Sequence, residues 1–128
     1  MQLTKLKKMA DTAFSLYIRQ RDSDENGFGK CVTCNTVNHY KKMDAGHFIS
    51  RDHAGTRYDD RNVFLQCKRC NIFMSGNKPE FAIFLMKRFG EGIVEDLVKT
   101  GNLIVRRRAW DYEELITRFK ELNGSLRE

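Results

Sequence analysis

The chain has 128 residues, of which 41% are hydrophobic and 31% are charged, and its formal net charge at pH 7 is +6. This composition fits a single globular domain over residues 1–128 and argues against a membrane, fibrous or disordered protein. The basic charge permits a polyanionic partner, although a soluble protein with a merely basic surface would carry the same charge.

The N-terminal part, residues 1–22, is predicted to be an amphipathic helix. Apolar residues recur largely at three- and four-residue intervals over residues 3–20, so one face should pack on the core. The polar segment 21–30 follows, with turn signals at Asn26-Gly27 and at Gly29. We expect this segment to be a loop that leads to the first pair of cysteines.

Two short strands are predicted in the middle of the chain, over Asp44–Ser50 and Asn62–Gln66. A polar connection that contains glycine joins them, which indicates a hairpin with an exposed tip at about residues 52–58. Asn71 is expected in the first turn of a short helix or tight loop after the second strand.

The C-terminal region, residues 79–128, is predicted to be helical. Pro79 suits the first position of a helix that ends near Gly90, and a second helix should end near Gly101. The last helix is expected to begin with Asp111 as its N-cap. Together with the strands, these helices predict an α+β fold.

Four cysteines form two pairs, Cys31-Val-Thr-Cys34 and Cys67-Lys-Arg-Cys70. Two CxxC pairs separated by a long insert are typical of four thiolates that bind one structural Zn²⁺. Two disulfides or a redox-active CxxC fit less well, because residues 1–8 contain lysines but no following apolar run that would indicate a signal peptide. We therefore expect structural zinc and a cytoplasmic protein.

The stretch Asn62-Val-Phe-Leu-Gln-Cys67-Lys-Arg-Cys70-Asn71 resembles the second half of the HNH motif, with Asn71 in place of the last histidine. The resemblance implies that Asn62 braces the loop after the hairpin and that Asn71 ligates a catalytic Mg²⁺ or Mn²⁺. Asparagine also occupies this position in some His-Me finger resolvases. The first histidine of the motif would be His47, as the general base.

Histidine suits the role of general base. An imidazole with a pKa near 6.5 is mostly neutral at physiological pH and can accept a proton from water that attacks a phosphodiester. In isolation, His47 would more often be a buried structural histidine or a zinc ligand. Its position between the two cysteine pairs favours catalysis. His39 and His53 lack such support and are interpreted as ordinary polar residues, although His53 could touch a phosphate.

The sequence departs from the HNH pattern at Gly46, where the residue before the histidine is commonly an acidic or histidine ligand of the metal. The carboxylate must then come from elsewhere. Because side chains two residues apart lie on the same face of a strand, Asp44 shares a face with Gly46 and is the nearest candidate.

The whole chain resembles the phage NinG or Rap family of recombination endonucleases, most densely over residues 31–77. The shared segments include Ala45-Gly-His-Phe-Ile-Ser-Arg51, Arg57-Tyr-Asp59 and Gln66-Cys-Lys-Arg-Cys-Asn71. The resemblance implies a small zinc-bound ββα His-Me finger core, framed by N- and C-terminal helices. It also implies cleavage of branched DNA that arises in recombination.

Basic residues flank the predicted site and form the expected DNA surface. They are Arg51, Arg57, Arg61, Lys68, Arg69 and Lys78. The run Arg106–Arg108 either contacts DNA or caps a strand.

Three functions are compatible with these patterns. The leading hypothesis is a metal-dependent endonuclease that acts on branched or distorted DNA. The alternative is a zinc-stabilised DNA-binding or recombination accessory module whose nuclease site has decayed. The missing metal ligand at Gly46 would fit such a decay. A ribonuclease of the same fold is a weaker third reading. The apolar C-terminal helices could form a homodimer interface, but packing in the core explains them equally well.

Overall fold

The computed structural model describes the backbone of residues 2–127 and the side chains of residues 2–124. It confirms the α+β organisation, with four helices and two antiparallel two-stranded sheets among the described residues. The elements are α1 (Leu3–Arg21), β1 (Phe28–Lys30), β2 (Val37–His39), the 3-10 turn η1 (Tyr40–Lys42), β3 (Asp44–His47), β4 (Val63–Gln66), the π-helical turn η2 (Arg69–Phe73), α2 (Lys78–Phe89), α3 (Ile93–Gly101) and α4 (Ala109–Arg127).

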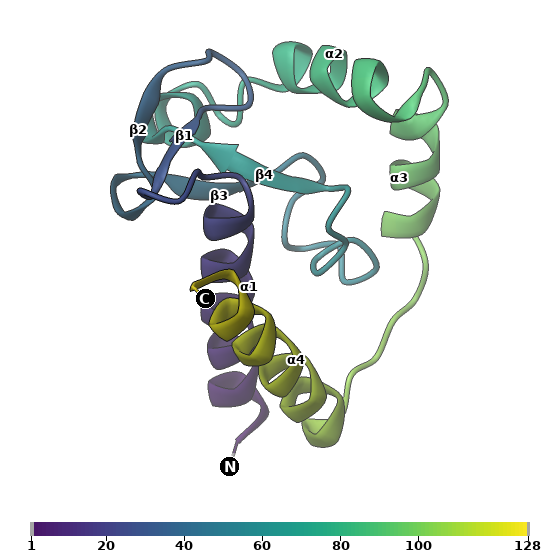
Figure 1. Cartoon of the computed structure of the whole chain (residues 1–128). Coiled ribbons are helices and arrows are strands. Elements are labelled where there is room, and N and C mark those ends of the chain that lie inside the picture. The colour runs from purple at the N-terminus through teal and green to yellow at the C-terminus, as the bar shows by residue number, and fades with distance from the viewer. Residues whose placement is uncertain (1, 128) are drawn as a thin grey trace.

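The first and last helices lie side by side and run in the same direction (Figure 1). Near their starts, Leu6 of α1 packs in one cluster with Tyr112 of α4. Further along, the ring centroids of Phe14 and Phe119 lie 4.9 Å apart. Phe14 also belongs to a cluster with Val63 of β4, so α1 packs against the β3–β4 sheet as well as against α4.

The segment before the first cysteine pair differs from the predicted loop. Residues 28–30 form β1, which pairs antiparallel with β2 and places Cys31 and Cys34 in the connection between the two strands. Each strand has only three residues, too few for a detectable alternation of polar and apolar residues.

The β3–β4 hairpin confirms the two predicted strands but ends earlier than the sequence indicated. Asp44 pairs with Gln66 and His47 pairs with Val63, while residues 48–50 lie outside the strand. Just beyond the last strand pair, the side chain of Asn62 takes the place of a backbone partner. Its Oδ1 accepts a hydrogen bond from Ile49 N at 2.8 Å. Its Nδ2 donates to the carbonyls of Ile49 and Thr56 at 2.9 and 3.2 Å.

The exposed tip predicted at about residues 52–58 is exposed only in part, at Asp52 and His53. Thr56 is fully buried, and a Cβ on Gly55 would lie 2.0 Å from the carbonyl oxygen of Thr100 in α3. Asn62, itself fully buried, thus holds a loop that packs against the end of α3.

Helices α2 and α3 bury Phe81 and Leu97 in a cluster with Phe64 of β4, which covers the face of the hairpin opposite α1. Asp111 was predicted to be the N-cap of α4, but it lies inside the first turn of that helix. From there its Oδ2 accepts a hydrogen bond from Arg108 N at 2.7 Å. Among the described residues, no helix is long and apolar enough to cross a membrane.

We predict that Asn62→Ala will unfold the protein more easily. The substitution leaves one buried and two part-buried backbone groups of the loop without their partner, and a fully buried group in this state costs about 1–3 kcal/mol. A free energy of unfolding lowered by at least about 2 kcal/mol in urea melts is therefore expected. Asn102→Ala, at an exposed asparagine, is the matched control and should change it by less than about 0.5 kcal/mol. Equal stabilities of the two variants would contradict the bracing contacts.

Candidate functional site

The four cysteine sulfurs come together from two separate parts of the chain. All four Sγ atoms lie within 4.8 Å of one another, and those of Cys34 and Cys67 are 3.7 Å apart. Tetrahedral zinc with Zn–S bonds of about 2.3 Å places its sulfurs about 3.8 Å apart. These residues therefore could bind a metal such as zinc, as the spacing of the cysteines predicted.

Hydrogen bonds around the sulfurs favour thiolates. Cys70 N and the Nδ2 of Asn77 point at the sulfurs of Cys67 and Cys70, at 3.4 and 3.6 Å. Burial opposes ionisation of Cys31, but hydrogen bonds from the Cys67 backbone and from Thr33 outweigh it and lower the pKa of this thiol to about 6. Burial and the neighbouring sulfurs raise the pKa of Cys67 to about 12. Four thiolates this close together would repel one another. A bound dication would offset the repulsion and let all four cysteines ionise.

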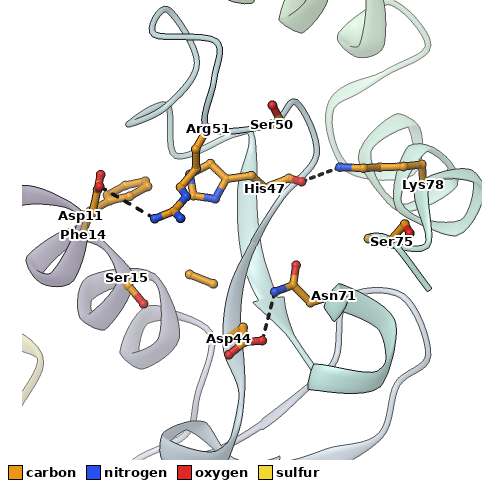
Figure 2. Close-up of a pocket in the computed structure, with 12 residues that line it drawn as sticks. Asp11, Phe14, Ser15, Asp44, His47, Ser50, Arg51, Asn71, Ser75 and Lys78 are labelled. Atoms are coloured by element: carbon orange, nitrogen blue, oxygen red, sulfur yellow. Dashed lines mark hydrogen bonds and ion pairs between the residues drawn. The ribbon is translucent and has the colours of Figure 1, made fainter. Parts of the chain in front are cut away.

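A pocket of about 500 Å³ lies along the unpaired edge of β3 (Figure 2). Three parts of the chain contribute its walls: α1, the strand β3 with the start of the following loop, and the segment after the second cysteine pair. The lining residues are Asp11, Phe14, Ser15, Asp44, Ala45, His47, Ser50, Arg51, Asn71, Ser75, Gly76 and Lys78. The predicted base and both predicted ligands of the catalytic metal therefore face one pocket.

His47 lies on the face of β3 that packs against α1, with its ring centroid 6.2 Å from that of Phe14. Its Nε2 lies 3.0 Å from the carbonyl oxygen of Arg57. A carbonyl only accepts hydrogen bonds, so Nε2 carries the proton, and in the neutral ring Nδ1 keeps a free lone pair. Burial lowers the pKa of His47 to about 4, and the hydrogen bond to Arg57 only partly offsets this effect.

Asp44 lies on the opposite face of β3 and meets Asn71 of η2. The Oδ2 of Asp44 accepts a hydrogen bond from Asn71 Nδ2 at 3.0 Å, and its Oδ1 accepts one from Lys68 Nζ at 2.7 Å. The Asn71 amide oxygen points toward the part of the pocket where His47 and Lys78 lie (Figure 2). A carboxylate beside an amide oxygen is a donor set that suits Mg²⁺ or Mn²⁺.

Gly46 has a packing explanation that the sequence did not reveal. A Cβ at this position would lie 2.1 Å from the side-chain oxygen and 2.9 Å from the Cβ of Gln66. Gln66 is fully buried, and its Nε2 donates to Thr33 Oγ1 and to the Gly76 carbonyl. Any larger residue at position 46 would displace this glutamine.

Asp11 of α1 is a pocket residue that sequence reasoning missed. Its carboxylate accepts two hydrogen bonds from Arg57, at 2.9 and 2.5 Å, and one from Tyr58 Oη at 2.8 Å. The ion pair with Arg57 fixes the segment whose carbonyl meets His47. The one available signal was an acidic residue beside the apolar positions of the helix, next to the buried Ala10.

The predicted DNA-binding cations occupy different environments. Arg51 and Lys78 line the pocket, and the Lys78 ammonium donates to the carbonyls of His47 and Phe48. Burial lowers the pKa of Lys78. Arg57 is only 12% exposed and is committed to Asp11, while Arg61 pairs with Asp59.

The two other candidates, Lys68 and Arg69, lie between the cysteines of the second pair and are exposed, and the Lys68 ammonium pairs with the pocket residue Asp44. Of the arginine run, Arg107 donates to the carbonyl of Ala54 at 3.0 Å. His53 is exposed, and His39 stacks on Tyr40 with ring centroids 4.7 Å apart. Neither of these two histidines lines the pocket.

Comparison with known proteins bears on the resemblance noted in the sequence. Proteins named ninG from Escherichia phage 933W and from phages P22 (Salmonella) and lambda (Escherichia) are 33%, 32% and 32% identical to this chain over 108 residues. The alignments cover 84% of this chain and 48–49% of those proteins, so the chain spans about half the length of the curated relatives it matches. No solved structure matches. The family model of the bacteriophage lambda NinG protein matches residues 2–128, and the chain therefore belongs to the NinG family.

Proposed function

We propose that this protein is a metal-dependent DNA endonuclease of the His-Me finger class, with a structural zinc bound by its four cysteines. The observation that carries the proposal is the arrangement of His47 in the pocket along β3. Its Nδ1 lone pair is free, and the Asp44–Asn71 pair lines the same pocket. The hairpin β3–β4 followed by η2 and α2 supports a ββα core.

His47 acts as the general base in the proposed reaction. Its Nδ1 accepts a proton from the attacking water, while the Arg57 carbonyl holds Nε2–H and keeps the ring in one orientation. The water oxygen then forms a bond to phosphorus, and the bond from phosphorus to the leaving oxygen breaks. Asn62 keeps the loop that carries the Arg57 carbonyl in place.

Asp44 and Asn71 would hold the catalytic divalent ion. When bound, Mg²⁺ or Mn²⁺ polarises the phosphoryl oxygen and stabilises the leaving oxygen. Asp44 would have to release or share the ammonium of Lys68, which now pairs with one of its oxygens. Lys68 would then be free to contact a phosphate.

The substrate that we propose is branched DNA of recombination, in line with the resemblance to the recombination endonucleases. The packing of Gly46 gives an explanation of the glycine other than decay of a nuclease site, because the buried Gln66 leaves no room for a side chain at position 46. Asp44, two residues earlier on the same face of β3, supplies a carboxylate beside Asn71 instead.

If the four cysteines bind a structural zinc, substitution of one of them should remove both the metal and the folded structure. Structural zinc sites provide an apparent binding free energy of about 10–16 kcal/mol, comparable to the whole stability of a small domain. Cys67→Ser should therefore lose its single equivalent of zinc by elemental analysis and its cooperative thermal transition by circular dichroism. Asn71→Ala, next to Cys70, should keep both and serves as the control. A well-folded native protein without zinc would refute this site.

The proposed ligands of the catalytic ion predict a change in metal affinity. Asp44→Ala should weaken Mn²⁺ binding in calorimetry by about tenfold or more, since even outer-shell partners of metal sites are worth about 10- to 100-fold. Asn71→Ala should act in the same direction and retain its zinc. Asp60→Ala removes an exposed carboxylate outside the pocket and should bind Mn²⁺ like the wild type. Unchanged affinity in both pocket variants would exclude these ligands.

The proposed base predicts a large and specific loss of cleavage. General-base catalysis contributes about 10²- to 10⁴-fold in rate, so zinc-replete His47→Ala should cleave more slowly by that factor while it binds DNA normally. His53→Ala, at an exposed histidine, is the control. Cleavage by His47→Ala at the wild-type rate would mean that the base lies elsewhere.

The pH dependence follows from the burial of His47. Only the neutral ring accepts a proton, and because the pKa is lowered to about 4, the ring stays neutral well below pH 6.5. Single-turnover cleavage at saturating metal should therefore change little between pH 8 and about pH 5 and fall as the pH approaches 4. A decline centred near the ordinary histidine pKa of about 6.5 would contradict a buried base.

A further inference from the structure

Three consecutive apolar side chains are exposed at the turn η2 and directly after it. Ile72 is 57% exposed, Phe73 is 84% exposed and Met74 is 43% exposed. Phe73 is the most exposed aromatic side chain in the part of the chain that the structure describes. Exposed apolar groups that gather in one place are unusual in soluble proteins and mark contact surfaces.

The backbone holds this apolar tip firmly. Asn71 N donates to the Cys67 carbonyl, Met74 N donates to the Arg69 carbonyl and Gly76 N donates to the Cys70 carbonyl, at 2.9, 2.9 and 2.8 Å. The next three residues, Ser75, Gly76 and Asn77, all have positive φ, of 50°, 90° and 48°. Left-handed backbone at two non-glycine residues costs free energy and is often found at functional sites.

The apolar tip stands at the rim of the pocket. Asn71, directly before Ile72, lines the pocket, and so do Ser75 and Gly76, directly after Met74. The chain thus leaves the pocket wall, presents Phe73 to solvent and returns to the wall. Phe73 is therefore two residues along the chain from a pocket-lining residue on either side, so a substrate that extends beyond the pocket can reach its ring.

Charge near the tip selects among partners. Arg69, at the start of η2, is exposed, and so is Lys68 directly before it, whose ammonium pairs with Asp44. A partner that contacts Lys68, Arg69 and Phe73 together needs negative charge next to a flat apolar face. Nucleic acid combines the two, with phosphates for the cations and a base for the ring. A two-fold contact with a second copy through the same tip would bring these like charges together instead.

We propose that Phe73 stacks on an unpaired or unstacked base beside the phosphate that the pocket holds, and so makes the protein prefer branched DNA. This inference rests on the proposed nuclease function and names the feature of the substrate that the same site recognises. In continuous duplex DNA, neighbouring bases cover each base face, and exposing one requires unstacking. At a branch point a base is exposed at little cost, so the ring gains a contact there that linear duplex does not offer.

The test compares affinity for a four-way junction and for a linear duplex of the same sequence, with zinc-replete protein and no added Mg²⁺ or Mn²⁺. Replacing an aromatic ring that stacks on a base by alanine typically weakens binding by about 5- to 150-fold. Phe73→Ala should lose affinity for the junction within this range and less than about twofold for the duplex. Phe73→Tyr keeps the ring and should bind the junction like the wild type. Ile104→Ala, at an 89% exposed residue outside the pocket, is the control.

Several outcomes would overturn the stacking role. They are equal losses on both DNAs, no loss on either, failure of the wild type to bind the junction, and a change of oligomeric state caused by Phe73→Ala in light scattering. The last outcome would assign the tip to contact between copies. The nuclease proposal is judged separately by cleavage with Mg²⁺ in wild type and His47→Ala. Continued His47-dependent cleavage with unchanged Phe73→Ala binding would remove only the stacking role.

Discussion

The contact between α1 and the β3–β4 hairpin governs most of the site. Phe14 and Ile18 of α1 pack with Val63 of β4, and the same face of the hairpin carries His47. This burial desolvates the imidazole and lowers its pKa, and it also brings Asp11 to the loop that hydrogen-bonds the ring. Helix α1 therefore contributes to the burial of the imidazole and, through Asp11, to the position of the Arg57 segment that hydrogen-bonds it.

The alternation of side chains along β3 places His47 and Asp44 on opposite faces of the strand within four residues. His47 faces α1, whereas Asp44 faces η2 and meets Asn71 there. Both reach the pocket because β3 has one unpaired edge in its two-stranded sheet. Lys78 donates to the carbonyls of His47 and Phe48, which places its Nζ at the same edge. In the proposed nuclease, this short hairpin would place the base on one of its faces and the metal ligands on the other.

The cysteine cluster connects this hairpin to the exposed tip. It ties the β1–β2 connection to the segment that follows β4, and the turn that carries Asn71 and Phe73 begins within the second CxxC pair. A metal bound by the four cysteines would fix the backbone at the start of this turn. The protein could then expose Phe73 in one conformation, because the turn would not depend on burial of its own apolar side chains for stability.

The sequence by itself determined the elements whose signal is local or depends on residue spacing. The four helices, the two strands of the hairpin and the gathering of the four cysteines followed from periodicity and from the CxxC spacing, and the NinG family followed from the motif residues. These features depend on neighbours in the chain, or on a motif whose geometry is the same wherever it occurs.

Only the tertiary structure decided the environment of each group. The three-residue strands β1 and β2 carry too little pattern to detect, and the packing of Gly55 against α3 depends on residues about 45 positions away. The lowered pKa of His47, the commitment of Arg57 to Asp11 and the reason for Gly46 all arise from contacts between distant segments. Burial and electrostatic pairing are properties of the assembled three-dimensional neighbourhood, and spacing along the chain does not encode them.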